Sequence, residues 1–286
     1  MSSSAKASTL ELPAPAKLNL FLHILGRRPD GYHELETLFQ FLDYGDEVGL
    51  TALDTDRIEL DSSVPVRPED NLAWRAAQLL KAETGCTRGC HIALHKRLPL
   101  GGGLGGGSSD AATVLLGLNA LWGLGLPLAD LAVLGVRLGA DVPVFVGGQS
   151  AFAEGIGERL TPVMPEAPWY LVVVPPVAVS TAEVFAHPEL TRDTPALRIR
   201  AFPSGGGHND FEPLVRRLYP EVDAAWRWLN AFAPARLTGS GAALFAAFST
   251  AAQAKAALSE LPAGCVGFCA RGCNRSPLHE TLARIV

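Results

Sequence analysis

The stretch "PLGGGLGGGSSDAA", residues 99–112, places six glycines in the seven positions 101–107. Each glycine loses more conformational freedom on folding than any other residue, so such a run indicates that something approaches the backbone closely. A strand-like segment, "HIALHKRL" (91–98), leads into it, and a helix-like segment, "SDAATVLLGLNALWGLG" (109–125), follows. This order aims free backbone N–H groups and a helix N-terminus at an anion. The stretch therefore predicts a phosphate-binding loop, in which the helix is capped by Ser108, Ser109 or Asp110.

Two common phosphate motifs do not fit this loop. No Gly-Lys-Ser/Thr sequence follows the glycines, so it is not a Walker A motif. A G-x-G-x-x-G pattern can be placed on Gly101, Gly103 and Gly106, but a helix is predicted where that motif requires an acidic residue at the end of a second strand. The apolar Leu104 inside the loop argues against a merely flexible surface segment.

The composition is that of a folded protein with a small net charge. The chain has 286 residues, of which 48% are hydrophobic and 19% charged, enough for about two domains. The net charge of -5 and the pI of about 5.8 give no overall attraction for nucleic acid or an anionic membrane. The first residues, "MSSSAKASTLEL", lack the apolar core of a signal peptide. We expect a cytoplasmic protein that binds small molecules and neither nucleic acid nor membrane; its oligomeric state is left open.

The five cysteines do not form a recognisable metal motif. An odd number of cysteines in a chain without a secretion signal favours free thiols. The segment "CVGFCARGC" (265–273) spaces its cysteines by four, whereas zinc ribbons use paired C-x2-C units. We expect no metal site built by the protein alone.

Strands and helices are intermixed without strict βαβ alternation, which predicts an α+β fold. The segment "AKLNLFLHIL" (16–25) alternates as a strand, with Lys17, Asn19, Phe21 and His23 on one face. The segment 142–163 is interpreted as a hairpin. The pattern restarts near residue 165, so two domains are expected, 1–164 and 165–286.

Polar residues in apolar surroundings mark candidate site positions. Lys17 and Asn19 share a strand face, which suggests a cleft, although most strand lysines are simply solvated. Asp141 lies in "LGADVPVFV" and needs a basic partner if it is buried; otherwise it is a turn or capping residue. Lys96 falls on the apolar face of its strand and is expected beside the nucleotide. The loop "GGGHND" (205–210) is interpreted as an ordinary loop with a helix cap at Asn209 and Asp210.

Residues 99–112 resemble the second motif of the GHMP kinases, which include galactokinase, homoserine kinase and mevalonate kinase. Three further stretches are similar to the same family: 13–48, 138–163 and 237–248. The serines stand two positions later than in the usual Gly-Leu-Gly-Ser-Ser motif, so which serine contacts phosphate or Mg²⁺ stays open. The resemblance implies a two-domain α+β kinase that uses ATP and Mg²⁺, with its active site in the cleft between the domains.

The resemblance also implies roles for individual residues. Lys17 and Asp141 are the expected catalytic pair, with Asp141 accepting or positioning the hydroxyl of the substrate. The expected ATP-binding residues are Lys96, Pro99, Leu100, Gly101, Gly102, Gly103, Leu104, Gly105, Gly106, Gly107, Ser108 and Ser109. Tyr32 and Phe185 are expected on the two faces of a cytosine ring and His33 at its edge. Other expected substrate contacts are Asn19, Thr181, Gly239, Ser240 and Gly241.

The substrate that the resemblance implies is a cytidyl-diphosphate sugar alcohol, phosphorylated on its 2-hydroxyl on the non-mevalonate route to isoprenoid precursors. Another GHMP kinase, such as one acting on homoserine, is the nearest alternative, but homoserine offers no ring to stack on. A non-catalytic nucleotide-binding protein is a second alternative, which the presence of both Lys17 and Asp141 disfavours. A dinucleotide-dependent oxidoreductase is more remote.

Overall fold

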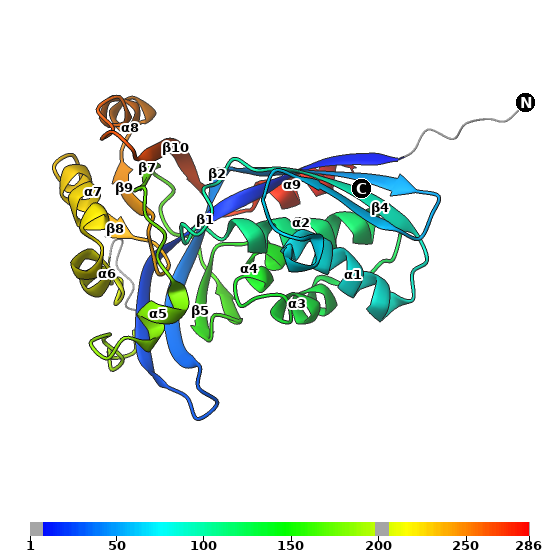
Figure 1. Cartoon of the computed structure of the whole chain (residues 1–286), viewed down its shortest axis with the longest axis horizontal. Helices are drawn as coiled ribbons and strands as arrows, with labels where there is room; N and C mark the ends of the chain where they lie inside the picture. Colours follow the sequence, from blue (N-terminus) through cyan, green and yellow to red (C-terminus); the bar gives the residue numbers. More distant parts are fainter. Residues whose placement is uncertain (1–7, 198–205, 286) are drawn as a thin grey trace, which may run out of the picture.

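The computed structural model describes residues 8–197 and 206–285. Two long antiparallel strands, β1 (Thr9–Arg27) and β2 (His33–Leu53), run through the length of the molecule (Figure 1). They belong to a ten-stranded sheet with the order β3-β4-β2-β10-β7-β9-β8, in which β1 and β5 also pair with β2 and β6 pairs with β5. The other strands are β3 (Ile58–Ser62), β4 (Gly89–His95), β5 (Ala151–Gly155), β6 (Arg159–Pro162), β7 (Trp169–Val174), β8 (Ala235–Leu237), β9 (Leu244–Phe248) and β10 (Val266–Cys273).

The helices gather in two groups at opposite ends of the sheet (Figure 1). One group packs with β1, β2 and β4: α1 (Leu72–Thr84), α2 (Gly106–Leu121), α3 (Leu128–Val136) and α4 (Val142–Gly147). The other lies beside β7–β9: α5 (Thr181–Ala186), α6 (Glu212–Leu218), α7 (Pro220–Asn230) and α8 (Ala251–Leu258). The predicted α+β fold is confirmed. No helix in the described part of the chain is long and apolar enough to cross a membrane.

Separate hydrophobic clusters correspond to the two groups of helices. Phe41, Leu50 and Leu115 are buried in the first, and Leu171 and Leu229 in the second. A third cluster, which includes Leu18, Val172 and Phe245, joins the strands between them. The last helix, α9 (Pro277–Ile285), returns to the first cluster through Leu278. The boundary at residue 165 stays a prediction, and α9 packs with the first half of the chain.

Two local predictions are wrong. The register of β1 against β2 shifts between Asn19 and Leu22, so the alternation does not continue through the strand. Leu22, and not Phe21, therefore joins Lys17 and Asn19 in lining the main cavity. Residues 142–147 form α4 instead of a strand, because Pro143 stands in the first turn and Gly148 ends the helix at φ 69°. The predicted hairpin is confirmed only for β5 and β6.

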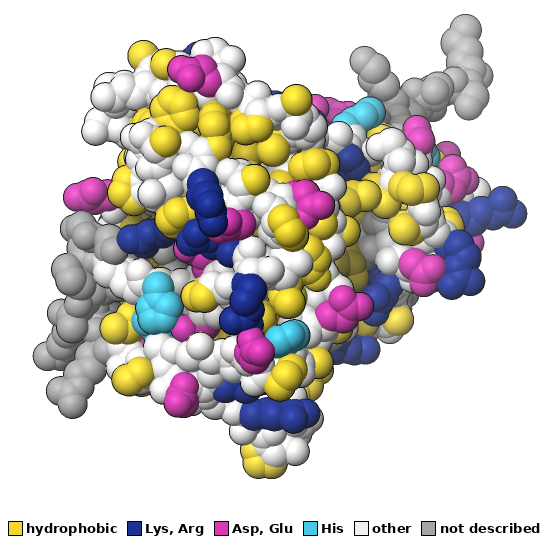
Figure 2. All heavy atoms as spheres, turned by 60° about the vertical axis from the view of Figure 1, so that its left-hand side comes forward, with side chains coloured by type: hydrophobic (Ala, Val, Ile, Leu, Met, Phe, Trp, Pro, Cys, Tyr) yellow, Lys and Arg dark blue, Asp and Glu magenta, His cyan; other side chains and the backbone are white. Residues whose placement is uncertain are grey.

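Charged side chains of both signs are interspersed on the face carried by the second half. In Figure 2, Lys and Arg side chains stand next to Asp and Glu side chains on this face. The ion pairs of the second half include Arg216 with Glu212 and Asp223, and Arg217 with Glu189. This distribution fits the small net charge of the chain.

Candidate active site

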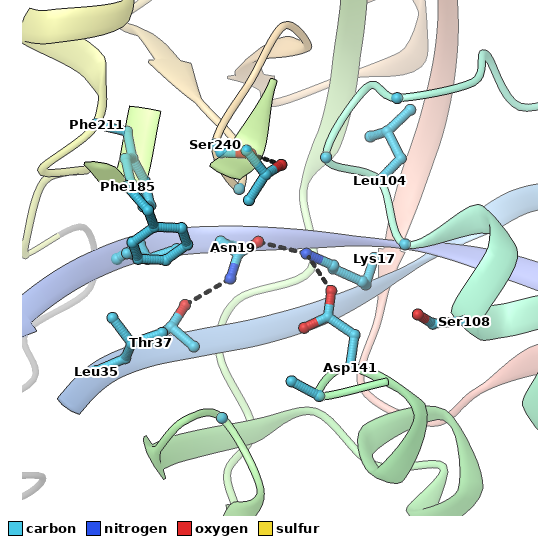
Figure 3. Close-up of a pocket in the computed structure, with 18 of the residues that line it drawn as sticks. Lys17, Asn19, Leu35, Thr37, Leu104, Ser108, Asp141, Phe185, Phe211 and Ser240 are labelled. Atoms are coloured by element: carbon cyan, nitrogen blue, oxygen red, sulfur yellow. Dashed lines mark hydrogen bonds and ion pairs between the residues drawn. The ribbon is translucent and has the colours of Figure 1, made fainter. Parts of the chain in front are cut away.

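A cavity of about 1140 Å³ lies between the glycine loop, the β1–β2 pair and α5. It is lined from both halves of the chain. In Figure 3, the glycine loop and Ser108 lie to one side of Lys17 and Asp141, and Phe185 and Phe211 lie to the other. Every residue predicted for the site lines the cavity except Ser109 and Gly241.

Lys17 is the central cation of this cavity. It is only 2% exposed, and its Nζ donates to Asn19 Oδ1 at 2.6 Å and lies 3.1 Å from Asp141 Oδ2. A buried ammonium group needs such partners to offset its lost hydration. The side chain of Asp141 is 34% exposed, so its carboxylate also faces the cavity. Lys17 and Asp141 thus lie together as an ion pair, and their catalytic roles stay a prediction.

Thr37, which the sequence analysis did not single out, orients Asn19. Asn19 Nδ2 donates to Thr37 Oγ1 at 2.8 Å, and Thr37 Oγ1 donates to the carbonyl of Phe21 at 2.5 Å. These two hydrogen bonds leave the side-chain oxygen of Asn19 turned toward Lys17. Thr37 comes from β2 and pairs with Leu22 of β1, so only the strand register places it in the site.

The glycine loop is held in place by backbone hydrogen bonds. The N–H of Lys17 donates to the carbonyl of Leu104 at 3.0 Å, and that of Ala243 donates to Gly102 at 3.2 Å. Leu104 is buried at 2% exposure and anchors the loop in the third cluster. Gly101, Gly103 and Gly105 adopt φ values of 70–75°, a left-handed conformation that favours glycine.

The helix after the loop begins earlier than predicted. Gly105 is the N-cap residue of α2, and no side chain caps the helix, so the predicted caps Ser108, Ser109 and Asp110 are wrong. The cause is the left-handed Gly105, which lets the helix start inside the glycine run. The first-turn residues Gly106, Gly107 and Ser108 line the cavity with uncapped N–H groups, which suit an anion.

The two loop serines have different surroundings. Ser108 lines the cavity and is half-buried. Ser109 is fully buried, and its hydroxyl has no hydrogen-bond partner among the described residues. Ser108 is thus the serine that offers its hydroxyl to the cavity.

Lys96 lines the cavity, but its ammonium is bound by two carboxylates. Its Nζ donates to Asp110 Oδ2 at 2.7 Å and contacts Asp46 Oδ2 as well. Asp46 Oδ1 accepts from the N–H groups of Arg97 and Leu98 at 2.6 and 2.8 Å. Asp46, which the sequence analysis missed, therefore holds the segment that leads into the glycine loop, and Lys96 links it to Asp110 in α2 after the loop. Burial raises the pKa of Asp110 to about 7, and Asp46 adds to the rise while Lys96 opposes it.

Aromatic rings form the other end of the cavity. His33 stacks on Phe185 with ring centroids 4.8 Å apart and planes at 25°, and Phe211 meets Phe185 edge-on. Tyr32 lines the cavity at 61% exposure. The predicted placement of Tyr32 and Phe185 on two faces of a base stays a prediction, and His33 covers one face of Phe185 in this structure.

A second glycine turn, residues 238–241, closes the cavity from the second half. Thr181 and Ser240 share a hydrogen bond of 2.6 Å between their hydroxyls. Asn209 Nδ2 donates to the carbonyls of Leu237 and Gly239, at 2.9 and 2.8 Å, and its Oδ1 accepts from the N–H of Phe211. The helix cap predicted at Asn209 and Asp210 is wrong, because the N-cap residue of α6 is Phe211 and no side chain caps that helix. Asn209 instead fixes the second glycine turn. Residues 198–205 of the neighbouring loop lie outside the described residues.

Two family models match the chain. The "GHMP kinases N terminal domain" matches residues 71–149 and the "GHMP kinases C terminal" model matches residues 195–267. The chain is 59% identical over 279 residues to a 4-diphosphocytidyl-2-C-methyl-D-erythritol kinase of Pseudomonas savastanoi, covering 97% of this chain and 96% of the relative. It is 55% identical over 281 residues to the Pseudomonas paraeruginosa kinase of the same name, covering 98% and 100%.

Solved structures agree with these matches. A crystal structure of a 4-(cytidine 5'-diphospho)-2C-methyl-D-erythritol kinase superposes with a TM-score of 0.81 at 35% identity, over 92% of this chain and 99% of that one. A homoserine kinase from Cytophaga hutchinsonii superposes with a TM-score of 0.70 at 19% identity, over 97% and 98% of the two chains, which shows a shared fold.

Proposed function

The chain belongs to the GHMP kinases, in the family of its 4-diphosphocytidyl-2-C-methyl-D-erythritol kinase relatives, and we propose that it transfers the γ-phosphoryl group of ATP to the 2-hydroxyl of 4-diphosphocytidyl-2-C-methyl-D-erythritol. Phosphoryl transfer of this kind depends mainly on positioning the reactants and neutralising their charge. The observation that carries the proposal is the ion pair of the buried Lys17 with Asp141, between the glycine loop and the aromatic end of one cavity.

Asp141 accepts the proton of the attacking hydroxyl or positions that hydroxyl. Its carboxylate faces the cavity, and a positioned carboxylate can take up a proton as the oxygen–phosphorus bond forms. Lys17 holds the carboxylate in place and offers positive charge beside the transferred group. Asn19 keeps the Lys17 ammonium directed toward the cavity, because Thr37 fixes the amide orientation.

ATP phosphates bind at the glycine loop. The uncapped N–H groups of the first turn of α2 and the positive end of its helix dipole favour an anion there. Magnesium prefers oxygen ligands and usually retains only one or two from the protein. The hydroxyl of Ser108 and the phosphate oxygens meet this requirement. When bound, Mg²⁺ neutralises charge on the phosphates.

The substrate occupies the rest of the cavity. Its base lies at the end formed by Tyr32, His33 and Phe185, and its sugar alcohol reaches Lys17 and Asp141. Between these positions, the amide of Asn19 and the hydroxyls of Thr181 and Ser240 supply hydrogen bonds to the diphosphate or the sugar alcohol. The enzyme works in the cytoplasm, where ATP is available.

A panel of alcohols tests this function. ADP release from ATP is measured with 4-diphosphocytidyl-2-C-methyl-D-erythritol, with 2-C-methyl-D-erythritol 4-phosphate that lacks the cytidyl group, and with homoserine. We expect turnover with the cytidyl compound and at least about 100-fold lower kcat/KM without the base, because stacking and edge contacts are lost. Comparable turnover of homoserine would contradict the proposal.

A further inference from the structure

Arg192 lines the aromatic end of the cavity. It follows α5, and its Nη2 donates to the carbonyl oxygens of Phe185 and His187, each at 2.7 Å. Its Nη1 donates to the carbonyl oxygen of Leu190 at 3.0 Å. Carbonyls at a helix C-terminus lack partners within the helix, and here the guanidinium supplies them. Arg192 therefore fixes the backbone that carries Phe185.

The same guanidinium reaches the other half of the chain. Its Nε donates to Nε2 of His33 at 3.2 Å, and His33 is the first residue of β2. An arginine side chain has only donors and keeps its proton, so Nε2 of His33 must supply a lone pair. A neutral imidazole whose Nε2 accepts carries its proton on Nδ1. The contact thus defines both the charge and the tautomer of His33.

The surroundings of His33 favour this neutral form. Burial lowers the pKa of His33, and the positive charges of Arg192 and Arg27 lower it further. Arg192 comes from the segment after α5 and Arg27 from the end of β1, and both charges oppose a second proton on the ring. Stacking on Phe185 holds the imidazole in the wall of the cavity. In the described part of the chain, Nδ1 of His33 has no hydrogen-bond partner.

A donating Nδ1 distinguishes the two common pyrimidines. At ring position 3, neutral cytosine carries a lone pair and uracil carries an N–H. An Nδ1–H group pairs with the cytosine nitrogen and meets the uracil N–H donor to donor, whereas the other tautomer reverses this preference. A hydrogen bond of fixed direction discriminates strongly, because the wrong ligand leaves polar groups unpaired.

We propose that Arg192 is a positioning residue that makes the cavity select a cytosine base, by holding His33 as a neutral imidazole protonated on Nδ1. The proposal rests on the proposed function, since it assumes that the base of the substrate meets His33. Beyond that function, it identifies Arg192, acting through His33, as the residue that sets the specificity for the base.

Two variants separate specificity from folding. Arg192→Met keeps an unbranched side chain but removes every donor, and Arg192→Lys restores one charged donor group. Arg217→Met is the matched control, because Arg217 pairs with Glu189 at the surface. Values of kcat and KM are measured at pH 8 for ATP, the cytidyl substrate and its uridyl counterpart, and circular dichroism checks folding.

We expect Arg192→Met to raise KM for the cytidyl substrate about tenfold and to lower the cytidyl-to-uridyl ratio of kcat/KM by at least about tenfold, since a directed hydrogen bond is lost. The KM for ATP stays within about twofold, and Arg192→Lys recovers part of the ratio. An unchanged ratio in folded Arg192→Met overturns the proposal.

Nitrogen-15 NMR of the His33 ring gives a second test that does not depend on the reaction. The wild-type ring should show the Nδ1–H pattern, and Arg192→Met should show a mixture or the Nε2–H pattern. An Nε2–H ring in the wild-type protein overturns the proposal. If the wild-type enzyme does not phosphorylate the cytidyl compound, the proposed function fails, and the NMR result identifies the tautomer independently.

Discussion

Gly103 and Gly239 meet backbone to backbone across the two halves of the chain. A Cβ added to Gly239 would lie 3.0 Å from Gly103 Cα, and one added to Gly103 would lie 2.5 Å from the carbonyl oxygen of Thr238. Both glycines also have positive φ, +74° for Gly103 and +57° for Gly239. Part of the glycine run is therefore needed for contact with the second glycine turn, in addition to any approach of phosphate.

Gly239→Ala should weaken the binding of both substrates and also lower the stability of the protein. The new methyl group meets backbone, which cannot move aside, and the φ of +57° is strained for alanine. We expect the free energy of unfolding to fall by about 1–3 kcal/mol and KM to rise for ATP and for the alcohol. Urea unfolding and steady-state kinetics measure the two effects. Gly123→Ala is the control, since Gly123 also has positive φ but has open space around it; equal effects of the two variants on KM would show that the contact is unimportant.

Gly107→Ala is a selective test of phosphate binding. Gly107 lies in the first turn of α2, has ordinary φ, lines the cavity, and an added Cβ would meet only Leu72 Cδ1 at 3.5 Å. Alanine should keep or improve the stability of the helix, because it has the higher helix propensity. We expect KM for ATP to rise while thermal stability is unchanged. Unchanged ATP affinity would place the phosphates elsewhere. Gly105→Val is less informative, because its side chain would clash with Phe145 and Lys17.

Phe185→Ala should affect the base end of the cavity alone. Losing one aromatic surface is expected to cost about 1–3 kcal/mol of binding to the cytidyl substrate. KM for that substrate should rise accordingly, with KM for ATP nearly unchanged. Phe232→Ala, which removes an exposed ring that meets Trp228 edge-on, is the matched control. If ATP affinity falls instead, Phe185 belongs to the adenine site.

The parts of the site that the sequence predicts are those with a local signal. The glycine run, the polar Lys17 and Asn19 within an apolar strand, and Asp141 after a helix all stand out against their neighbours. The α+β class follows from the mixture of periodicities. These features need no knowledge of which strands pair.

The residues that sequence reasoning missed depend on pairing between distant segments. Thr37 orients Asn19 only because the register of β2 against β1 brings it there. Asp46 braces the glycine loop from a strand that is distant in sequence, and Arg192 reaches His33 across the cavity. The shift in strand register after Asn19 places Leu22 at the cavity. The alternating sequence pattern does not predict this shift.

The contribution of His279 to the stability of the protein should be lost as the pH drops through the range in which histidine titrates. Burial lowers the pKa of His279 below the usual 6.5, although the carbonyls of Phe145 and Val146 oppose the shift. In the unfolded chain this imidazole binds a proton near pH 6.5, whereas in the folded protein it binds one only at lower pH. Its contribution is therefore present above pH 6.5 and is lost as the pH falls through the folded-state pKa. Urea unfolding at pH 7.5 and 5.5 should show a smaller decrease for His279→Asn than for wild type. The same decrease in both would assign the loss to other groups; His95→Asn, at the surface, is the control.

Asp141→Asn tests the proposed chemistry directly. Asparagine keeps the shape and hydrogen-bonding capacity of the side chain but removes its charge and its ability to accept a proton. Turnover should fall by about 10²–10⁴, the usual range for a positioned acid or base. The affinity for both substrates should remain, because the glycine loop and the aromatic end of the cavity are unaltered. Single-turnover phosphoryl transfer at saturating substrates measures the rate, and circular dichroism confirms folding.

The Lys17–Asp141 contact of 3.1 Å leads to a prediction for Lys17 that the same experiment tests. If the two residues act as one unit, Lys17→Ala is similarly slow and the double variant is little slower than either single variant. Asp130→Asn, on the exposed surface of α3, is the matched control and should retain full activity. A folded Asp141→Asn enzyme within about threefold of wild type would remove Asp141 from proton transfer, because a positioned base contributes far more than threefold. The carboxylate would then serve only to neutralise the buried ammonium of Lys17.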